Sequence, residues 1–244
     1  MTTLLLINPN TTASITDLVL TTAKRFAAKG TTLRAVTGAF GPRYIASRIG
    51  YAIAGHAAVD ALANDTARKD AVVLACFGDP GLAALKEVSR VPVVGMAEAA
   101  ILQATAIGKR FSIVTGGERW KPMLEEFVAA QGMSARLASV RTVAPTGADI
   151  ARNPKAAMAL LAKGCTACMR EDGADVVILG GAGLAGLAAN LKSAVDVPLL
   201  DGVACAISLA ESLAKQKPAA LGRKAAPVES IGLSKGLAKL IGSP

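Results

Sequence analysis

Short apolar runs alternate along the chain with longer stretches in which apolar and polar positions recur at a helical period. Residues 4–7 form the first apolar run, a helical stretch spans about 12–29, and a second apolar run covers 33–37. The alternation continues to residues 176–179 and beyond. Apolar runs of this length are typical of buried strands, and helices between them are typical of a parallel sheet. The pattern therefore predicts an α/β protein.

The chain is 52% hydrophobic with a mean hydropathy of +0.44, a composition that calls for a test of membrane insertion. A spanning helix needs about 18 or more consecutive apolar residues, and no such stretch occurs because Ala and Gly supply much of the hydrophobicity. No basic segment precedes the first apolar run, and Asn8-Pro9-Asn10 follows it at once. We expect no membrane association and a cytoplasmic location.

The two halves of the sequence resemble each other. Residues 68–84 align without a gap on residues 173–189, which pairs Asp70 with Asp175 and Cys76 with Gly181. "VPVVG" from Val91 matches "VPLLD" from Val197 at nearly the same offset. We therefore expect two pseudo-symmetric lobes, each a parallel sheet flanked by helices, with the active site in the inter-lobe cleft. The first lobe is predicted to comprise 1–103 plus about 208–244, and the second 104–207.

Ligands of open parallel sheets bind outside the carboxyl ends of the strands. These ends predict the substrate-binding residues, which are Asn8, Pro9, Asn10, Phe77, Gly78, Thr115, Gly116, Gly181, Ala182 and Gly183. Asp79 and Pro80 follow the second of these ends in a pattern that predicts an N-cap and a first helical residue. A helix N-terminus at each strand end would offer N–H groups to a carbonyl or carboxylate oxygen.

The formal net charge is +9, but the basic residues are scattered. The densest group is Lys215, Lys217, Arg223 and Lys224. Aromatic residues make up only 3% of the chain, so a nucleic-acid partner is not expected. The charge is compatible with a small anionic substrate. Arg43, Tyr44 and Arg48 follow Gly41-Pro42 and are candidate anion clamps, with solvated loop residues as an equal alternative.

Four cysteines in a chain of this length, with no export signal expected, predict free thiols. Cys165 and Cys168 form a C-x-x-C inside a helical pattern without partner ligands, which favours packing over a metal site. Cys205 is also expected to pack. His56, the sole histidine, lies in a probable helix and is a second candidate acid, although a surface or packing role is favoured. No metal and no cofactor are expected.

The segments "INPNTT", "ACFGDPG" and "VILGGAGLAG", with "VTGGER" and "DGVACA", resemble the aspartate/glutamate/hydantoin racemase superfamily, and most closely its hydantoin and allantoin racemase branch. The resemblance covers the whole chain. It implies two facing α/β lobes, no metal or pyridoxal cofactor, and one cysteine per lobe that exchanges protons with a carbon beside a carbonyl. Cys76 matches the first-lobe cysteine, and Gly181 stands where the second would be.

The resemblance thus implies a cofactor-independent racemase or epimerase with Cys76 as acid and base, acting on a small substrate with carbonyl or carboxylate groups. Helix N-termini would lower the pKa of a thiol, whereas the nearby Asp79 would raise it. Backbone N–H groups around Gly78, Gly116 and Gly183 would stabilise an enolate-like intermediate. The opposite-face acid is unassigned, and water beside Gly181 is one alternative. The loop around Tyr44 departs from the family pattern.

Three alternatives remain open. A single thiol is also found in decarboxylases of the arylmalonate type, and a chain without the second cysteine could be a non-catalytic small-ligand-binding protein. Gly181, Gly183 and Gly186 form a G-x-G-x-x-G with Asp201 at a suitable distance, as in dinucleotide-binding proteins, but the duplication explains these glycines better. Assembly into a homo-oligomer is left open.

Overall fold

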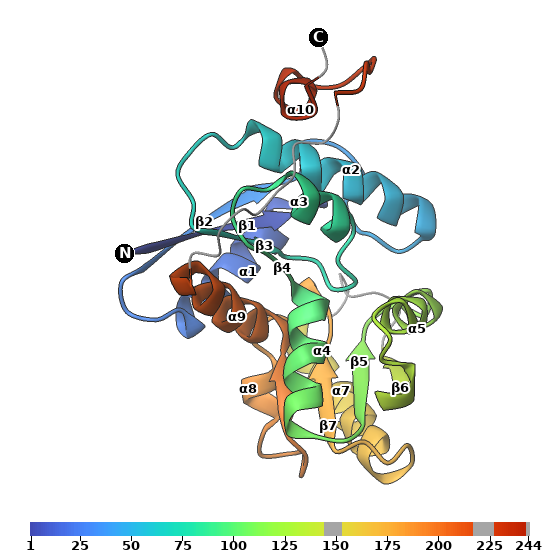
Figure 1. Ribbon diagram of the computed structural model, residues 1–244. Coiled ribbons are helices and arrows are strands. Elements are labelled where there is room, and N and C mark those ends of the chain that lie inside the picture. Colours follow the sequence, from blue (N-terminus) through green and yellow to red (C-terminus); the bar gives the residue numbers. More distant parts are fainter. Residues whose placement is uncertain (144–152, 217–226, 243–244) are drawn as a thin grey trace.

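The computed structural model describes residues 1–143, 153–216 and 227–242 and contains two four-stranded sheets (Figure 1). The strands of the first are β1 (Thr2–Asn8), β2 (Thr31–Thr37), β3 (Ala71–Leu74) and β4 (Val93–Gly95), and those of the second are β5 (Phe111–Thr115), β6 (Leu137–Thr142), β7 (Val176–Leu179) and β8 (Leu199–Asp201). All pairings are parallel, and the orders β2-β1-β3-β4 and β6-β5-β7-β8 are equivalent. This arrangement confirms the prediction of two pseudo-symmetric parallel-sheet lobes.

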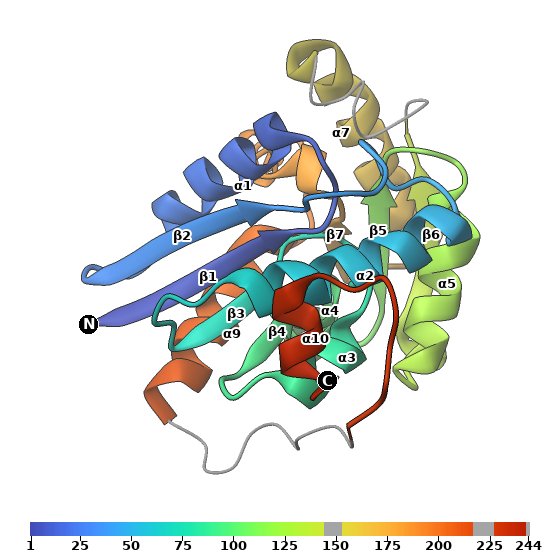
Figure 2. The ribbon, with the colours of Figure 1, turned by 90° about the horizontal axis from the view of Figure 1, so that it is seen from above.

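Helices flank both sheets. They are α1 (Ala13–Phe26), α2 (Arg48–Asn64), α3 (Leu82–Val88), α4 (Met96–Ile107), α5 (Trp120–Ala130), α7 (Pro154–Arg170), α8 (Ala188–Leu191), α9 (Gly202–Gln216) and α10 (Lys235–Leu240), with short 3₁₀ turns η1 (Ser134–Arg136) and η2 (Ala182–Leu184). Seen from above, α1 lies on one side of β1 and β2 while α2 and α10 lie on the other (Figure 2).

The apolar runs form strands that are buried on both faces. In β1, Leu4 and Leu6 belong to one core cluster, whereas Leu5 and Ile7 belong to another on the opposite face of the sheet. Successive strand side chains point to opposite faces, so a strand covered by helices on both sides must be apolar at every position. The larger cluster also includes Ile113 of β5, so one core continues from the first lobe into the second.

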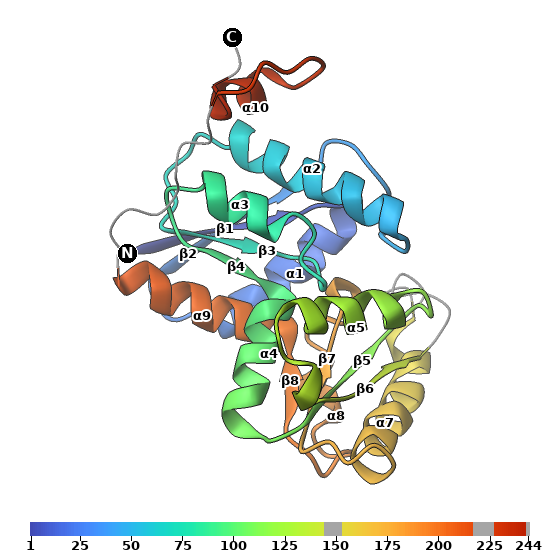
Figure 3. The same cartoon turned by 45° about the vertical axis from the view of Figure 1, so that its right-hand side comes forward.

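The two lobes exchange their connecting helices. Helix α4 starts directly after β4 of the first sheet but contacts β5, β7 and β8 of the second. Helix α9 starts directly after β8 of the second sheet but contacts β1, β3 and β4 of the first, and α4 and α9 pack on each other (Figure 3). The predicted boundaries at 103/104 and 207/208 fall inside these two helices, and the assignment of whole lobes to residue ranges stays a prediction.

A buried carboxylate lies at the N-terminus of each exchanged helix. Asp79 accepts hydrogen bonds from the N–H groups of Ala97 and Glu98 in α4, at 3.0 and 2.8 Å. Asp201 accepts from Val203 and Ala204 in α9, at 2.9 and 3.2 Å. These bonds satisfy N–H groups that have no partner within a helix, and they place a negative group at its positive end.

The predicted N-cap role of Asp79 is therefore wrong. Asp79 has a left-handed backbone (φ +52), and α3 begins only at Leu82, after Gly81. The Asp79 carboxylate instead reaches across the turn to α4, 18 residues along the chain. Local sequence suggested a cap for the adjacent helix, but a long-range partner competes for the same side chain.

The remaining sequence expectations concern composition and surface. No helix within 1–143, 153–216 and 227–242 is long and apolar enough to cross a membrane, and these ranges hold no cluster of three or more metal-ligating side chains. Cys165 and Cys168 are buried on α7 in the apolar core of the second lobe. Lys217, Arg223 and Lys224 of the basic group lie outside the described residues.

The close approach of Asp79 to Gly95 yields a stability prediction. A Cβ added at Gly95 would overlap the Asp79 carboxylate, and it would also come within 2.8 Å of Leu82 Cδ2. Gly95→Ala should therefore lower the free energy of unfolding in denaturant titration by about 3 kcal/mol, as overpacking does. Gly132→Ala is the control, since Gly132 (φ +71) has no atom within 4 Å of its added Cβ and pays about 1 kcal/mol of backbone strain alone. Equal losses in the two variants would refute the steric argument.

Candidate functional site

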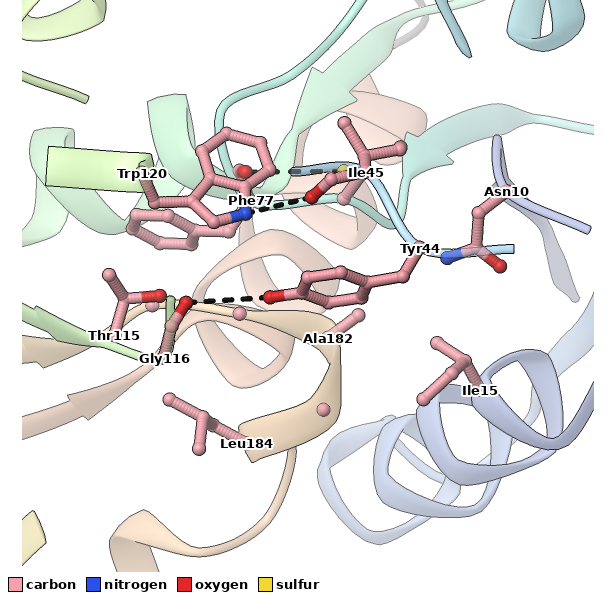
Figure 4. Close-up of a pocket in the computed structure, with 14 residues that line it drawn as sticks. Asn10, Ile15, Tyr44, Ile45, Phe77, Thr115, Gly116, Trp120, Ala182 and Leu184 are labelled. Atoms are coloured by element: carbon pink, nitrogen blue, oxygen red, sulfur yellow. Dashed lines mark hydrogen bonds between the residues drawn. The ribbon is translucent and has the colours of Figure 1, made fainter. Parts of the chain in front are cut away.

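A pocket, partly open to solvent, lies where the carboxyl ends of the two sheets meet (Figure 4). Its lining comes from both lobes and from the loop before α2. The lining residues are Asn10, Ile15, Tyr44, Ile45, Cys76, Phe77, Thr115, Gly116, Trp120, Gly180, Gly181, Ala182, Gly183 and Leu184.

The structure brings most of the candidate site residues to this pocket. Those that line it are Asn10, Tyr44, Cys76, Phe77, Thr115, Gly116, Gly181, Ala182 and Gly183, and those that do not are Asn8, Pro9, Gly78, Arg43 and Arg48. The roles assigned to the lining residues remain predictions.

Asn8 supports the site from behind. Its side-chain nitrogen donates to Asn10 Oδ1 and Thr16 Oγ1, both at 3.0 Å, and the residue is 1% exposed. Asn10 Oδ1 also accepts from the N–H of Thr12 at 2.9 Å. The amide oxygen of Asn10 is thus occupied, while its Nδ2 has no hydrogen-bond partner among the described residues and remains a donor for a ligand.

The loop before α2 links the first lobe to the second. Tyr44 Oη donates to the carbonyl oxygen of Gly116 at 3.4 Å, and Trp120 Nε1 donates to the carbonyl of Ile45 at 2.9 Å (Figure 4). Arg48 pairs with Glu126 of α5, and both side chains are exposed. We name residues 42–48 the inter-lobe strap.

The two arginines of the predicted anion clamp, Arg43 and Arg48, do not reach the pocket. Arg48 is engaged by Glu126, and Arg43 is exposed; neither lines the pocket. Only Tyr44 of the three reaches it. The charge of an arginine at the surface is screened by solvent, so these two side chains do not give the pocket a positive wall.

Cys76 lines the pocket from the first lobe and lies two residues after the end of β3. The residue is 7% exposed, and its Sγ lies 4.0 Å from the carbonyl oxygen of Phe77. Burial, together with the negative charge of Asp79, raises the pKa of the Cys76 thiol well above its usual range. The next helix along the chain, α3, begins only at Leu82, six residues after Cys76. Cys76 is therefore held as a protonated thiol at neutral pH.

Gly181 occupies the equivalent position in the second lobe, two residues after β7. Its backbone (φ +139, ψ +134) is one that side-chain-bearing residues rarely adopt. Space is not limiting, since an added Cβ would lie 3.6 Å from Thr115 Oγ1 and from Leu184 Cγ. The glycine is therefore required by backbone geometry, and a cysteine introduced there would carry strain.

Close packing across the lobes involves residues that the sequence did not single out. A Cβ at Gly180 would lie 2.6 Å from the Phe77 ring, and one at Gly78 would lie 2.7 Å from the Trp120 ring. The lining residues that sequence reasoning missed are Ile15, Ile45, Trp120, Gly180 and Leu184. The available signals were weak: Trp120 is the single tryptophan, and Ile45 and Gly180 adjoin predicted residues.

Among the described residues that line the pocket, none has a side chain that is charged at neutral pH. Its polar groups are the side chains of Asn10, Tyr44, Cys76 and Thr115 together with backbone amides. The N–H groups of Gly116 and Ala182 donate no hydrogen bond to any described residue. The arrangement offers neutral hydrogen-bond donors and one thiol within an apolar wall.

The dinucleotide alternative lacks the carboxylate it needs. Asp201, which would bind a ribose, is 6% exposed and accepts from the N–H of Gly186, the last glycine of the motif, at 2.6 Å. The glycines lead into the 3₁₀ turn η2 and the four-residue helix α8, whereas a dinucleotide fold places a long helix there. This segment is therefore built as a wall of the pocket.

His56 and Cys205 lie away from the site. His56 is exposed on α2, with its ring 4.8 Å from that of Phe40, and it does not line the pocket. Cys205 is buried in α9. Neither position supports the role of second acid for His56 or any chemical role for Cys205.

Comparison with known proteins agrees with this geometry. A family model described as Asp/Glu/Hydantoin racemase matches residues 4–210. The hydantoin racemase of Pseudomonas sp. (strain NS671) is 36% identical over 208 residues, covering 85% of this chain and 84% of that protein. The crystal structure of allantoin racemase from Pseudomonas fluorescens superposes with a TM-score of 0.86 at 32% identity, covering 99% of this chain and 97% of that one.

A more distant likeness extends to a variant of arylmalonate decarboxylase, with a TM-score of 0.67 at 18% identity over 88% of this chain and 93% of that one. This likeness concerns the fold. The fold and site together define a two-lobed α/β isomerase class with its site between the lobes. The chain belongs to the Asp/Glu/hydantoin racemase family.

The buried carboxylate beside Cys76 yields a prediction about pH. Burial raises the pKa of Asp79 from 3.8 to about 7, although the N–H groups of Ala97 and Glu98 oppose this shift. The folded protein therefore holds this proton up to about pH 7, whereas the unfolded chain releases it near 3.8. The contribution of Asp79 to stability is present below about pH 4 and is lost as the pH rises to about 7.

Asp79→Asn should remove this dependence of stability on pH between about pH 4 and 7. The variant is less stable at every pH, because an amide has one acceptor oxygen for two N–H groups, but its melting temperature should fall less steeply than that of the wild type between pH 4 and 7. Thermal unfolding followed by circular dichroism at several pH values measures both slopes. Parallel slopes in the two proteins would contradict the assignment.

Proposed function

We propose that this protein is a cofactor-independent racemase of the hydantoin racemase type, in which Cys76 exchanges a proton with a carbon beside a carbonyl. The observation that carries the proposal is the Cys76 thiol facing a pocket between two strand-end walls that are lined by neutral donors. The racemase relatives support the same class of reaction.

The residues of this chain divide the chemistry between them. The Cys76 thiolate removes the proton from the substrate carbon and returns it as a thiol. The enolate oxygen that develops is stabilised by donors that have no partner among the described residues, namely the N–H groups of Gly116 and Ala182 and the side-chain nitrogen of Asn10. Because burial raises the pKa of the Cys76 thiol, the reaction in this direction starts from the fraction of the protein in which Cys76 has released its proton to solvent.

The neutral lining favours a neutral substrate. A substrate carboxylate in this pocket would meet no cation among the lining residues that the structure describes, and an uncompensated charge in an apolar site is costly. A five-membered cyclic ureide presents carbonyl oxygens and ring N–H groups without a formal charge and matches the polar groups present. A substituted hydantoin is therefore preferred to a free amino acid.

A decarboxylase of the arylmalonate type is the second candidate, since Gly181 leaves one thiol in the pocket. That reaction starts from a substrate carrying carboxylates, for which the described lining residues provide hydrogen-bond donors but no cation. The same absence of charge that supports a hydantoin therefore weighs against a malonate. Release of carbon dioxide from an aryl malonate would reverse this order.

Deuterium exchange tests the proposal. Wild-type protein incubated with single enantiomers of 5-substituted hydantoins in deuterated water should label the ring carbon and lose optical rotation. Cys76→Ser should lower both rates by about 10³-fold, because a hydroxyl is far less acidic than a thiol. The rates are followed by proton NMR and polarimetry.

Cys205→Ser is the matched control, with the same atom exchanged at a buried site outside the pocket, and it should keep both rates within a few-fold of the wild type. Exchange that persists in Cys76→Ser would eliminate Cys76 as the proton carrier. No exchange by the wild type on any hydantoin would overturn the racemase proposal in favour of binding.

A further inference from the structure

Racemisation needs two proton carriers, because a proton leaves one face of the carbon and another arrives on the opposite face. The second lobe offers Gly181 at the position equivalent to Cys76, and glycine carries no proton. The polar side chains of the lining are Asn10, Tyr44, Cys76 and Thr115. Of these only the thiol (pKa about 8.5) and the phenol (pKa about 10) ionise in an accessible range.

The Tyr44 hydroxyl lies against the second lobe, although its backbone belongs to the first. It donates to the carbonyl oxygen of Gly116, which follows β5, and Thr115 is the last residue of that strand. Thr115 Oγ1 lies 3.6 Å from the point where a side chain at Gly181 would begin. In Figure 4 the Tyr44 ring extends across the pocket from the side of Asn10 to Thr115 and Gly116.

We propose that Tyr44 is the second proton carrier of this enzyme, placed by the inter-lobe strap on the wall where Gly181 leaves no acid group. This inference rests on the proposed racemase function. In one direction the Cys76 thiolate takes the proton from the carbon, and the Tyr44 phenol gives its own to the opposite face. The products are a thiol, a phenolate and the inverted substrate, so that the reverse reaction begins with the phenolate as base.

The strap is anchored on both sides of Tyr44. On the first-lobe side, Thr11 N–H donates to the carbonyl of Pro42 at 3.2 Å and Thr12 Oγ1 donates to that of Arg43 at 2.6 Å. On the second-lobe side, Trp120 Nε1 binds the carbonyl of Ile45 at 2.9 Å. A phenol held between fixed neighbours is preorganised, as a proton donor must be.

Tyr44→Phe tests the proposal because it removes the hydroxyl and keeps the ring. Racemisation should fall by about 10²-fold or more in both directions, since one general acid–base group is lost. The enantiomer whose proton faces Cys76 should still exchange deuterium with retention of configuration at a rate within a few-fold of the wild type. The opposite enantiomer should lose its exchange along with racemisation.

Tyr51→Phe is the matched control, since these are the two tyrosines of the chain. Tyr51 Oη donates to the carbonyl of Gly78 at 2.7 Å and does not line the pocket, so it supports the turn that carries Cys76. In this variant racemisation and exchange should decline together for both enantiomers. A split between the two rates is therefore specific to a carrier on one face.

Three outcomes would overturn the assignment. Unchanged racemisation by Tyr44→Phe would make water beside Gly181 the second acid, and a parallel loss of both rates for both enantiomers would reduce Tyr44 to a positioning residue. Retained exchange of the enantiomer whose proton faces away from Cys76 would exclude the opposite-face role. Each of these leaves the proposed function intact, because that function is tested separately by exchange in the wild type and in Cys76→Ser.

Discussion

The hydrogen bonds from the N-terminus of α4 to the Asp79 carboxylate are the constraint on which the site depends. They tie the turn after Cys76 to the helix that leaves the first sheet and packs on the second. Asp201 does the same for α9, which runs in the opposite sense between the lobes. Because both exchanged helices share one apolar core, the two strand-end walls are held at a fixed separation, and the pocket between them is a property of the fold.

The same constraint determines the electrostatics of the thiol. A carboxylate placed to bind α4 is necessarily near Cys76, since the Asp79 N–H donates to the carbonyl of Cys76 at 3.1 Å. Burial and the negative charge of Asp79 both raise the pKa of the Cys76 thiol, so Cys76 is a thiol and not a thiolate in this structure. When Asp79 is protonated, its negative charge no longer disfavours a thiolate at Cys76. Because the pKa of Asp79 is about 7, this protonation occurs near neutral pH. The charge next to the thiol therefore depends on the protonation of Asp79, whereas the described lining residues themselves carry none.

The sequence was sufficient to predict the two lobes, the parallel sheets and most of the pocket wall, because each depends on local periodicity and on the rule that ligands bind at strand carboxyl ends. It failed where a side chain has a distant partner. The local sequence makes Asp79 resemble an N-cap of α3, but its carboxylate binds the N-terminus of α4. Asn8 resembles a ligand-binding amide, but its side-chain nitrogen donates to Asn10 and Thr16. Trp120 and Ile15 could not be assigned to the pocket because only tertiary packing brings α5 and α1 to it.

The duplicated halves share the same strand order but differ in the residues that supply the buried carboxylate and the proton carrier. In the first lobe the carboxylate comes from Asp79 and would collide with any side chain at Gly95. In the second lobe it comes from Asp201, which is equivalent to Gly95 in the repeat, while Leu184 stands where Asp79 would be. Each lobe thus keeps a carboxylate at the N-terminus of its exchanged helix, but the two lobes supply it from different positions of the repeat. At the positions of Cys76 and Gly181, too, the two lobes differ. Under the proposal above, the proton carrier missing at Gly181 is supplied by another element, since the inter-lobe strap places the Tyr44 hydroxyl against the second-lobe wall. Symmetry of the reaction requires two carriers on opposite faces, but it does not require that they be the same residue or come from equivalent positions.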